Sequence, residues 1–155
     1  MLKVNLIAVG KVKEKYFSDG IAEYSKRLNR FCEFKIIEVT EEPCLKENSS
    51  EYEIVKKKEG ARILPFLKGK CYAMAIEGKK ISSKAFSEYF ENASLFGGEI
   101  TFIIGGSYGL DDSIKQKCSL LSFSDMTFPH TLFRLMLTEQ IYRAFSILNG
   151  SPYHK

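Results

Sequence analysis

The sequence predicts an α/β fold in which a mostly parallel sheet carries helices on both faces. Five short apolar runs occupy residues 4–9, 34–39, 72–76, 100–104 and 120–123. Most of these runs lack an alternation of apolar and polar residues, which is typical of strands buried on both faces of a parallel sheet. Helix-favouring stretches separate the runs, and this alternation of strands and helices favours right-handed crossover connections.

The helices are predicted from amphipathic spacing and from end signals. The stretches lie at residues 16–30, 50–64, 83–95 and 131–149. In the third stretch, Ser83 can cap the first turn, and Phe86, Phe90 and Ala93 recur at helical spacing. Gly150 follows the fourth stretch and is a typical helix stop. The chain has 155 residues without an internal repeat or linker, so residues 1–155 are predicted to form a single domain.

Composition narrows the class of protein. Hydrophobic residues make up 45% of the chain and charged residues 27%, which excludes a disordered, collagen-like or coiled-coil protein. No apolar run reaches the ~18 residues of a membrane span, and no signal peptide is evident, so we expect a cytoplasmic protein without a membrane partner.

The four cysteines show no CxxC spacing, which favours reduced thiols over a disulfide framework and leads us to expect no metal site. A net charge of +4 is compatible with nucleic-acid binding without demonstrating it.

Three loops that follow predicted strands are the candidate ligand-binding segments, because parallel sheets bind ligands beyond the carboxyl ends of their strands. They are residues 77–80, 105–110 and 124–130. The second loop contains Gly105, Gly106 and Gly109. It lacks the Gly-Lys-Ser/Thr of a phosphate-binding P-loop, and it does not follow the first strand as a Rossmann fingerprint does. The glycines therefore indicate either close approach of a ligand to the backbone or a tight turn.

The last predicted helix is apolar on nearly every side, so more than one of its faces must be buried. We expect a second copy of the chain to cover one face, giving a homodimer; packing between the sheet and a neighbouring helix is the alternative. Glu139 and Arg143 lie one helical turn apart and form either an ordinary ion pair or part of a functional site. Tyr153 and His154 belong either to a frayed tail or to a set of polar groups that contact a ligand.

Four segments carry a resemblance to a known family. They are residues 3–28, residues 102–110 (FIIGGSYGL), residues 121–145 (LSFSDMTFPHTLFRLMLTEQIYRAF) and the terminal PYHK. Over its whole length the chain resembles the ribosomal RNA large subunit methyltransferase H family, small bacterial members of the SPOUT class. The resemblance implies an α/β fold with a C-terminal trefoil knot, a homodimer, and S-adenosyl-L-methionine as cofactor. It also implies methylation of N3 of a pseudouridine in 23S rRNA within the assembled 70S ribosome.

The resemblance also implies site residues. The cofactor is expected against Met74 and Ile76, against Gly105 and Gly106, and against residues 123–128. The members of that last segment are Phe123, Ser124, Asp125, Met126, Thr127 and Phe128. The implied substrate site consists of Glu139, Arg143, Tyr153 and His154.

Methylation at N3 of a uracil-type ring requires removal of a proton, because the lone pair that attacks appears only on deprotonation. We interpret Arg143 as the group that stabilises the resulting anion through a ring carbonyl. Either His154 or Glu139 can accept the proton, and we prefer His154 as the base, with Glu139 orienting Arg143. Tyr153 is expected to stack on the nucleobase or position it.

Three other interpretations remain open. A non-catalytic RNA-binding or ribosome-binding α/β protein would bind RNA but no cofactor. A nucleotide-binding enzyme would hold a phosphate on the glycine loop, but only Asp111 and Asp112 lie beside that loop to bind Mg²⁺, and a helix N-cap role suits one of them better. The third is a SPOUT methyltransferase that acts on another RNA, such as tRNA.

Overall fold

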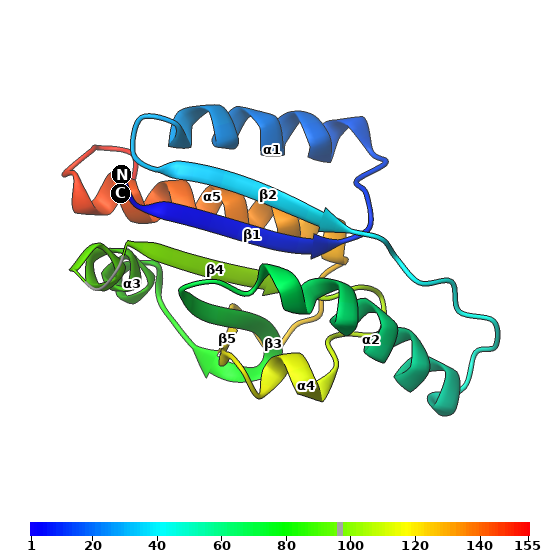
Figure 1. The fold of residues 1–155 in the computed structure, drawn as a ribbon. Helices are drawn as coiled ribbons and strands as arrows, with labels where there is room; N and C mark the ends of the chain where they lie inside the picture. Colours follow the sequence, from blue (N-terminus) through cyan, green and yellow to red (C-terminus); the bar gives the residue numbers. More distant parts are fainter. Residues whose placement is uncertain (96–97) are drawn as a thin grey trace.

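The computed structural model describes residues 1–95 and 98–155, over which the chain forms a five-stranded sheet (Figure 1). The strands are β1 (Lys3–Val9), β2 (Glu33–Val39), β3 (Lys70–Lys80), β4 (Glu99–Ile104) and β5 (Ser119–Ser122). Their spatial order is β2-β1-β4-β3-β5, and every neighbouring pair is parallel. The predicted α/β class with a parallel sheet is therefore confirmed.

Helices cover both faces of this sheet (Figure 1). They are α1 (Lys15–Leu28), α2 (Ser49–Ile63), α3 (Ser83–Leu95), α4 (Asp112–Lys115) and α5 (His130–Leu148), with a 3-10 turn at Leu64–Phe66. The first core cluster joins α1, α3 and α5 to one face, and the second joins α2 and α4 to the other. The four longer helices agree with the predicted stretches, whereas α4 and the 3-10 turn are too short to show a periodic pattern. Among residues 1–95 and 98–155, none of the helices is both long and apolar enough to cross a bilayer.

Burial of both sheet faces accounts for the missing alternation in the strand sequences. In β1, Leu6 and Ile7 are both fully buried, yet they belong to opposite core clusters. Phe102 and Ile103 of β4 divide between the clusters in the same way. Because successive side chains of a strand point to opposite faces, a strand covered on both faces has to be apolar throughout.

The short helix α4 begins at the cap expected beside the glycine loop. The backbone N–H of Ser113 donates to Oδ2 of Asp111 at 3.1 Å, and the Ser113 hydroxyl donates to the same oxygen. This satisfies one of the N–H groups that the first turn of a helix leaves free. The interpretation of one of the two neighbouring aspartates as an N-cap is confirmed, with Asp111 in that role.

The long helix α5 packs against the sheet between α1 and α3. Leu137 and Ile141 are fully buried in the first core cluster. Close packing against α1 depends on Gly20, because a Cβ at that position would lie 2.9 Å from Cδ1 of Leu135. Neighbouring helices of the same chain thus account for part of the apolar surface that led us to expect a homodimer.

A buried arginine ties the first turns of α5 to the carboxyl ends of β1 and β2. Arg134 is almost fully buried, and it forms an ion pair with Glu38 of β2. Its Nη2 donates to the carbonyl oxygen of Gly10, directly after β1, at 3.0 Å. A charge buried this deeply is costly unless it is paired, so these contacts hold α5 in place at the edge of the sheet where the ligand loops meet.

Candidate functional site

A pocket of about 660 Å³ lies at the carboxyl ends of β3, β4 and β5. Its walls come from the end of β3, the glycine loop after β4, the segment after β5 and the first turn of α5. The three loops selected from the sequence all contribute to it, as the geometry of a parallel sheet leads one to expect. The volume is in the range of sites that bind small molecules and cofactors.

The strand β3 leaves the ladder where it forms the pocket wall. Met74 pairs with Leu121 of β5, and after an irregularity Lys79 pairs with that same residue. Residues 75–78 therefore bulge out of the sheet, and pairing resumes only for the last two residues of the strand. The strand predicted to end at residue 76 in fact continues through this bulge to Lys80, because no sequence pattern marks a bulge of this kind.

Close approach of two backbones makes the bulge possible. A Cβ at Gly78 would lie 2.6 Å from backbone atoms of Leu121, closer than real Cβ atoms approach a neighbour. Only glycine fits this position without a shift of the strands. The bulge leaves Ile76 in the pocket wall with 49% of its surface exposed, so the pocket presents an uncovered apolar side chain to a ligand.

The glycine loop, residues 105–110, is both a tight turn and a wall of the pocket. A Cβ at Gly105 would lie 2.8 Å from the carbonyl carbon of Gly109, and Gly109 itself has a φ of +89°. Such a φ is rarely adopted by residues with a side chain. Gly105, Gly106 and Gly109 also line the pocket. The two interpretations of the glycines therefore describe the same piece of backbone.

Polar contacts shape the segment after β5. The Ser122 hydroxyl donates to the carbonyl oxygen of Ser124 at 2.9 Å, and the N–H of Met126 donates to the Ser124 hydroxyl at 3.0 Å. Asp125 is exposed and forms an ion pair with Lys80 at the end of β3. The segment is thus held both by its own turn and by the neighbouring strand.

Nine of the ten residues assigned to a cofactor line the pocket: Met74, Ile76, Gly105, Gly106, Phe123, Ser124, Met126, Thr127 and Phe128. The tenth, Asp125, is not among the lining residues. Phe133 and Lys115 also line the pocket, although the sequence analysis did not select them. Lys115 pairs with Glu77 at 2.9 Å and lowers the pKa of that carboxyl, a contact that only the tertiary fold creates. In the described part of the chain, no set of three or more His, Cys, Asp or Glu residues is arranged to hold a metal ion.

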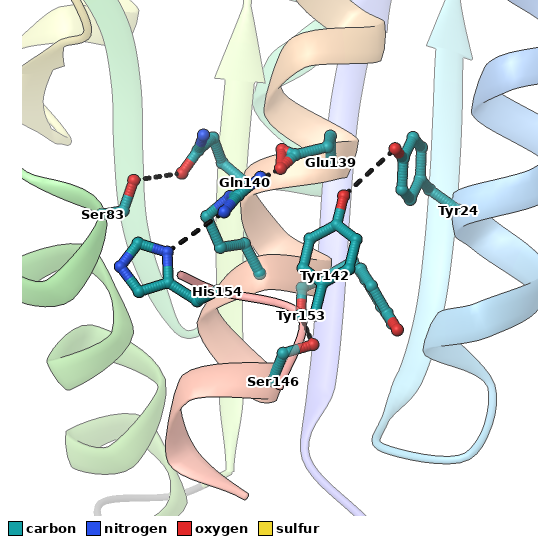
Figure 2. A network of polar contacts seen from close by, with 9 residues as sticks. Tyr24, Ser83, Glu139, Gln140, Tyr142, Ser146, Tyr153 and His154 are labelled. Atoms are coloured by element: carbon teal, nitrogen blue, oxygen red, sulfur yellow. Dashed lines mark hydrogen bonds and ion pairs between the residues drawn. The ribbon is translucent and has the colours of Figure 1, made fainter. Parts of the chain in front are cut away.

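Glu139, Arg143 and His154 form a chain of polar contacts on the C-terminal half of α5 and the tail. Figure 2 labels its two ends, Glu139 and His154. Nε of Arg143 donates to Oε1 of Glu139 at 2.7 Å. Nη1 of Arg143 lies 3.1 Å from Nδ1 of His154. A guanidinium group has only donors, so Nδ1 is the acceptor of this hydrogen bond. With Tyr153, these residues make up the Arg143 cluster.

Tyr153 supports the guanidinium group instead of presenting a free ring. Its ring centroid lies 4.8 Å from Cζ of Arg143, and it packs edge-on against Tyr142. Its hydroxyl shares a hydrogen bond of 3.1 Å with that of Tyr24 (Figure 2). Burial and this hydrogen bond raise the pKa of Tyr153, so the phenol stays protonated at neutral pH. Arg143 covers one face of the Tyr153 ring, so a nucleobase could stack on that face only if the guanidinium group moved.

The pocket and the Arg143 cluster lie at different points along α5. Phe133 lines the pocket, and Arg143 follows ten residues later. At 1.5 Å per residue, this places the two about 15 Å apart along the helix axis. A smaller hollow of about 230 Å³ between them shares Phe123 with the pocket and reaches Gln140, the neighbour of Glu139. Within one chain, therefore, the two parts of the candidate site do not meet.

Glu59 is a buried carboxyl group beside the glycine loop that the sequence analysis did not select. Its side chain lies in α2 and is only 3% exposed. Oε2 accepts the backbone N–H of Glu42 at 3.0 Å, whereas Oε1 is buried without a hydrogen-bond partner. A Cβ at Gly106 would lie 3.0 Å from that Oε1. Burial raises the pKa of Glu59, and nothing in the local sequence distinguishes it from the exposed acids of the same helix.

Comparison with known proteins places the chain in a family. The family model described as "Predicted SPOUT methyltransferase" matches residues 2–154. This chain belongs to the SPOUT methyltransferase family. The ribosomal RNA large subunit methyltransferase H of Streptococcus uberis is 52% identical over 159 residues, covering 99% of this chain and 100% of the relative. Proteins of the same name from Streptococcus thermophilus and Streptococcus pyogenes are 54% and 51% identical, with the same coverage.

Solved structures share the fold of this SPOUT methyltransferase at low sequence identity. A probable methylase family protein from Haemophilus influenzae has a TM-score of 0.51 at 12% identity and covers 99% of this chain and 70% of its own. A structure described as giving insights into the 2-OH methylation of C/U34 on tRNA has a TM-score of 0.50 at 13% identity, covering 96% and 98%. At such identities the likeness concerns the fold alone.

Replacing Glu59 by Gln is expected to make the folding stability of this SPOUT methyltransferase less sensitive to rising pH. Because burial raises the folded-state pKa above the usual 4.5, the stability that the protonated acid contributes is full below that value and is lost as the pH rises through the folded pKa. The loss is about 1.4 kcal/mol for each unit by which the folded pKa exceeds the unfolded one. The amide of the Glu59→Gln variant stays neutral, so the melting temperature of the variant should exceed that of the wild type by a margin that grows from pH 5 up to the folded pKa of Glu59 and is constant above it.

The matched control for this measurement is Glu88→Gln, since Glu88 is exposed on α3. Its melting temperature should follow that of the wild type across the same pH range. Parallel melting curves for the wild type and Glu59→Gln would contradict the burial cost assigned to Glu59.

Proposed function

We propose that this SPOUT methyltransferase transfers a methyl group from S-adenosyl-L-methionine to N3 of a pseudouridine in 23S rRNA, within the assembled 70S ribosome. The observation that carries the proposal is full-length identity of 50% or more to proteins named ribosomal RNA large subunit methyltransferase H. The pocket and the Arg143 cluster support it, because they offer a cofactor site and a set of groups suited to handling the N3 proton.

The pocket residues fit S-adenosyl-L-methionine. Ile76, Phe123 and Phe128 give apolar walls suited to a flat purine ring. Gly105 and Gly106 leave backbone groups uncovered by side chains, which suits the polar parts of such a ligand. When bound, the cofactor supplies an electrophilic methyl group on a positively charged sulfur.

The Arg143 cluster supplies the control of the proton at N3. Arg143 beside a ring carbonyl stabilises the deprotonated ring and so lowers the pKa of N3. Glu139 holds Nε of Arg143, so the Nη atoms can exchange partners and turn toward the carbonyl. When Nη1 leaves His154 for the carbonyl, Nδ1 of His154 becomes free to accept the N3 proton. Tyr153 supports the guanidinium group throughout.

The working enzyme is a homodimer in this proposal. The pocket and the Arg143 cluster are about 15 Å apart along α5, so one chain cannot bring both to one nucleotide. In a symmetric pair with antiparallel α5 helices, the Arg143 cluster of one copy lies beside the pocket of the other. The hollow that joins Phe123 to Gln140 marks the surface between the two parts on each copy.

The trefoil knot expected from the family resemblance also belongs to the proposal. Its support is the match of residues 2–154 to the SPOUT methyltransferase family model. The segment after β5, which turns back on itself at Ser124 and is tied to Lys80, is the expected cover of the cofactor.

Calorimetric titration of the purified protein with S-adenosyl-L-methionine is expected to show one binding site per chain. Ile76→Arg should weaken binding by at least about tenfold, because it places a charge and a long side chain in an apolar wall. Since Ile76 is 49% exposed, the fold should tolerate the change. The matched control is Ile54→Arg on α2, where Ile54 is 44% exposed outside the pocket and binding should be unchanged. Equal binding by Ile76→Arg and wild type would overturn the cofactor site.

Single-turnover methyl transfer is expected to be faster on 70S ribosomes than on protein-free 23S rRNA. A net charge of +4 gives only weak electrostatic binding to free RNA. His154→Ala should slow transfer by about 10²–10⁴-fold at neutral pH, and the defect should shrink as the pH rises and N3 ionises unaided. Lys155→Ala, in the same exposed tail, is the control and should keep the wild-type rate.

Several outcomes would contradict this assignment. Equal rates on naked rRNA and 70S ribosomes would overturn the ribosomal substrate, and transfer to tRNA alone would favour another RNA. Binding to ribosomes without any transfer would favour a non-catalytic protein. A pH-independent defect in His154→Ala would assign the residue a structural role instead of the base.

Mixed dimers test the shared site directly. Arg143→Ala should be inactive as a homodimer, and so should Ile76→Arg when S-adenosyl-L-methionine is kept well below the weakened Kd of that variant. Random pairing of equal amounts of the two variants makes about half of the dimers mixed. In a mixed dimer, one of the two sites combines the intact pocket of one chain with the intact Arg143 of the other. About a quarter of wild-type activity should therefore return. Activity that stays absent on mixing would show that each chain uses only its own residues.

A further inference from the structure

Two cysteines lie side by side at the amino ends of β3 and β5. Tyr72 of β3 pairs with Ser119 of β5, so the preceding residues, Cys71 and Cys118, face each other across the two chain segments. Both side chains pack against the same core cluster. The Cys71 thiol donates weakly to the carbonyl oxygens of Lys68 and Gly69, each at 3.6 Å. Both cysteines are free in the structure. Neighbouring strands lie about 4.8 Å apart, which is within the range of Cα separations that a disulfide spans.

The environment of this pair favours reaction at Cys71. The neighbouring Cys118 thiol lowers the pKa of Cys71 to about 7, while the Cys71 thiol in turn raises the pKa of Cys118. The ammonium group of Lys70 adds to the lowering. A lowered pKa favours the thiolate, which is the nucleophilic form of a cysteine. By contrast, burial raises the pKa of Cys32 to about 12, which keeps that thiol protonated and inert.

We propose that Cys71 and Cys118 form a reversible disulfide site that is oxidised by hydrogen peroxide. The Cys71 thiolate attacks one peroxide oxygen, the O–O bond breaks, and the products are a sulfenic acid and hydroxide. The Cys118 sulfur then attacks the sulfenic sulfur, the S–O bond breaks, and water leaves with the Cys118 proton. In total the two thiols lose two electrons, and the peroxide is reduced to water. A dithiol reductant reverses the reaction by thiol–disulfide exchange.

The bond would join the strands that carry two walls of the pocket. Cys71 precedes Met74 by three residues, Cys118 precedes Leu121 by three, and Met74 and Leu121 are paired at the pocket. The bond therefore lies about 10 Å from the pocket along both strands. Because it closes a long loop of the unfolded chain, the oxidised protein should melt about 10 °C higher than the reduced protein.

The test exposes the native full-length protein to near-stoichiometric hydrogen peroxide, followed by thiol titration and peptide mass spectrometry. Two of the four thiols should be lost, a peptide pair linked through Cys71 and Cys118 should appear, and dithiothreitol should restore all four thiols. Cys44→Ser is the control, since Cys44 is a partly exposed cysteine outside the pair and its removal should leave the linkage intact. Cys118→Ser should stop the reaction at a Cys71 sulfenic acid, which dimedone traps.

Three results would overturn the proposal. The first is four free thiols under conditions that oxidise free glutathione. The second is a linkage that includes Cys44, or one that forms between Cys71 and Cys118 only after denaturant is added. The third is a melting temperature that falls on oxidation, since that would mean that the fold does not hold the two sulfurs at bonding geometry.

Discussion

Backbone crowding between β3 and β5 at Gly78 is the constraint on which the pocket depends. The approach is too close for any side chain, and it allows β3 to leave the ladder after Met74 and to rejoin it at Lys79. The bulge places Ile76 in the pocket wall instead of in the core. The segment after β5 then closes the other side, held to β3 through Lys80. One glycine thus decides the shape of two of the pocket walls.

The fold class and most of the pocket could be predicted from the sequence, because both depend on local patterns. Runs such as Leu6–Ile7, apolar at successive positions, indicate a sheet covered on both faces, and the loops after the strands of such a sheet meet at one edge. The rest depends on contacts between distant segments. Lys115 reaches Glu77 only through the tertiary fold, and Glu59 has no distinguishing neighbour in sequence. The contact between Cys71 and Cys118 depends on strand order, which spacing does not reveal.

Two arginines of α5 have different roles at different points along the helix. Arg134 is buried, paired with Glu38 and bonded to the carbonyl of Gly10, so its charge serves to anchor the helix. Arg143 is partly exposed and held by Glu139 through one nitrogen, which leaves its outer nitrogens able to exchange partners. The difference follows from burial, because a buried charge that loses its partner is far more costly than one that water can reach.

The helix α5 also works as a spacer, because its first turn lines the pocket and its later turns carry the Arg143 cluster. A single inserted or deleted residue between Phe133 and Glu139 would rotate everything beyond it by about 100° and shift it by about 1.5 Å. Leu137 would then leave the core, and Glu139 and Arg143 would turn away from His154. Over this stretch the chain should accept changes of residue far more readily than changes of length, so gaps in this helix should be rarer among functional relatives than substitutions.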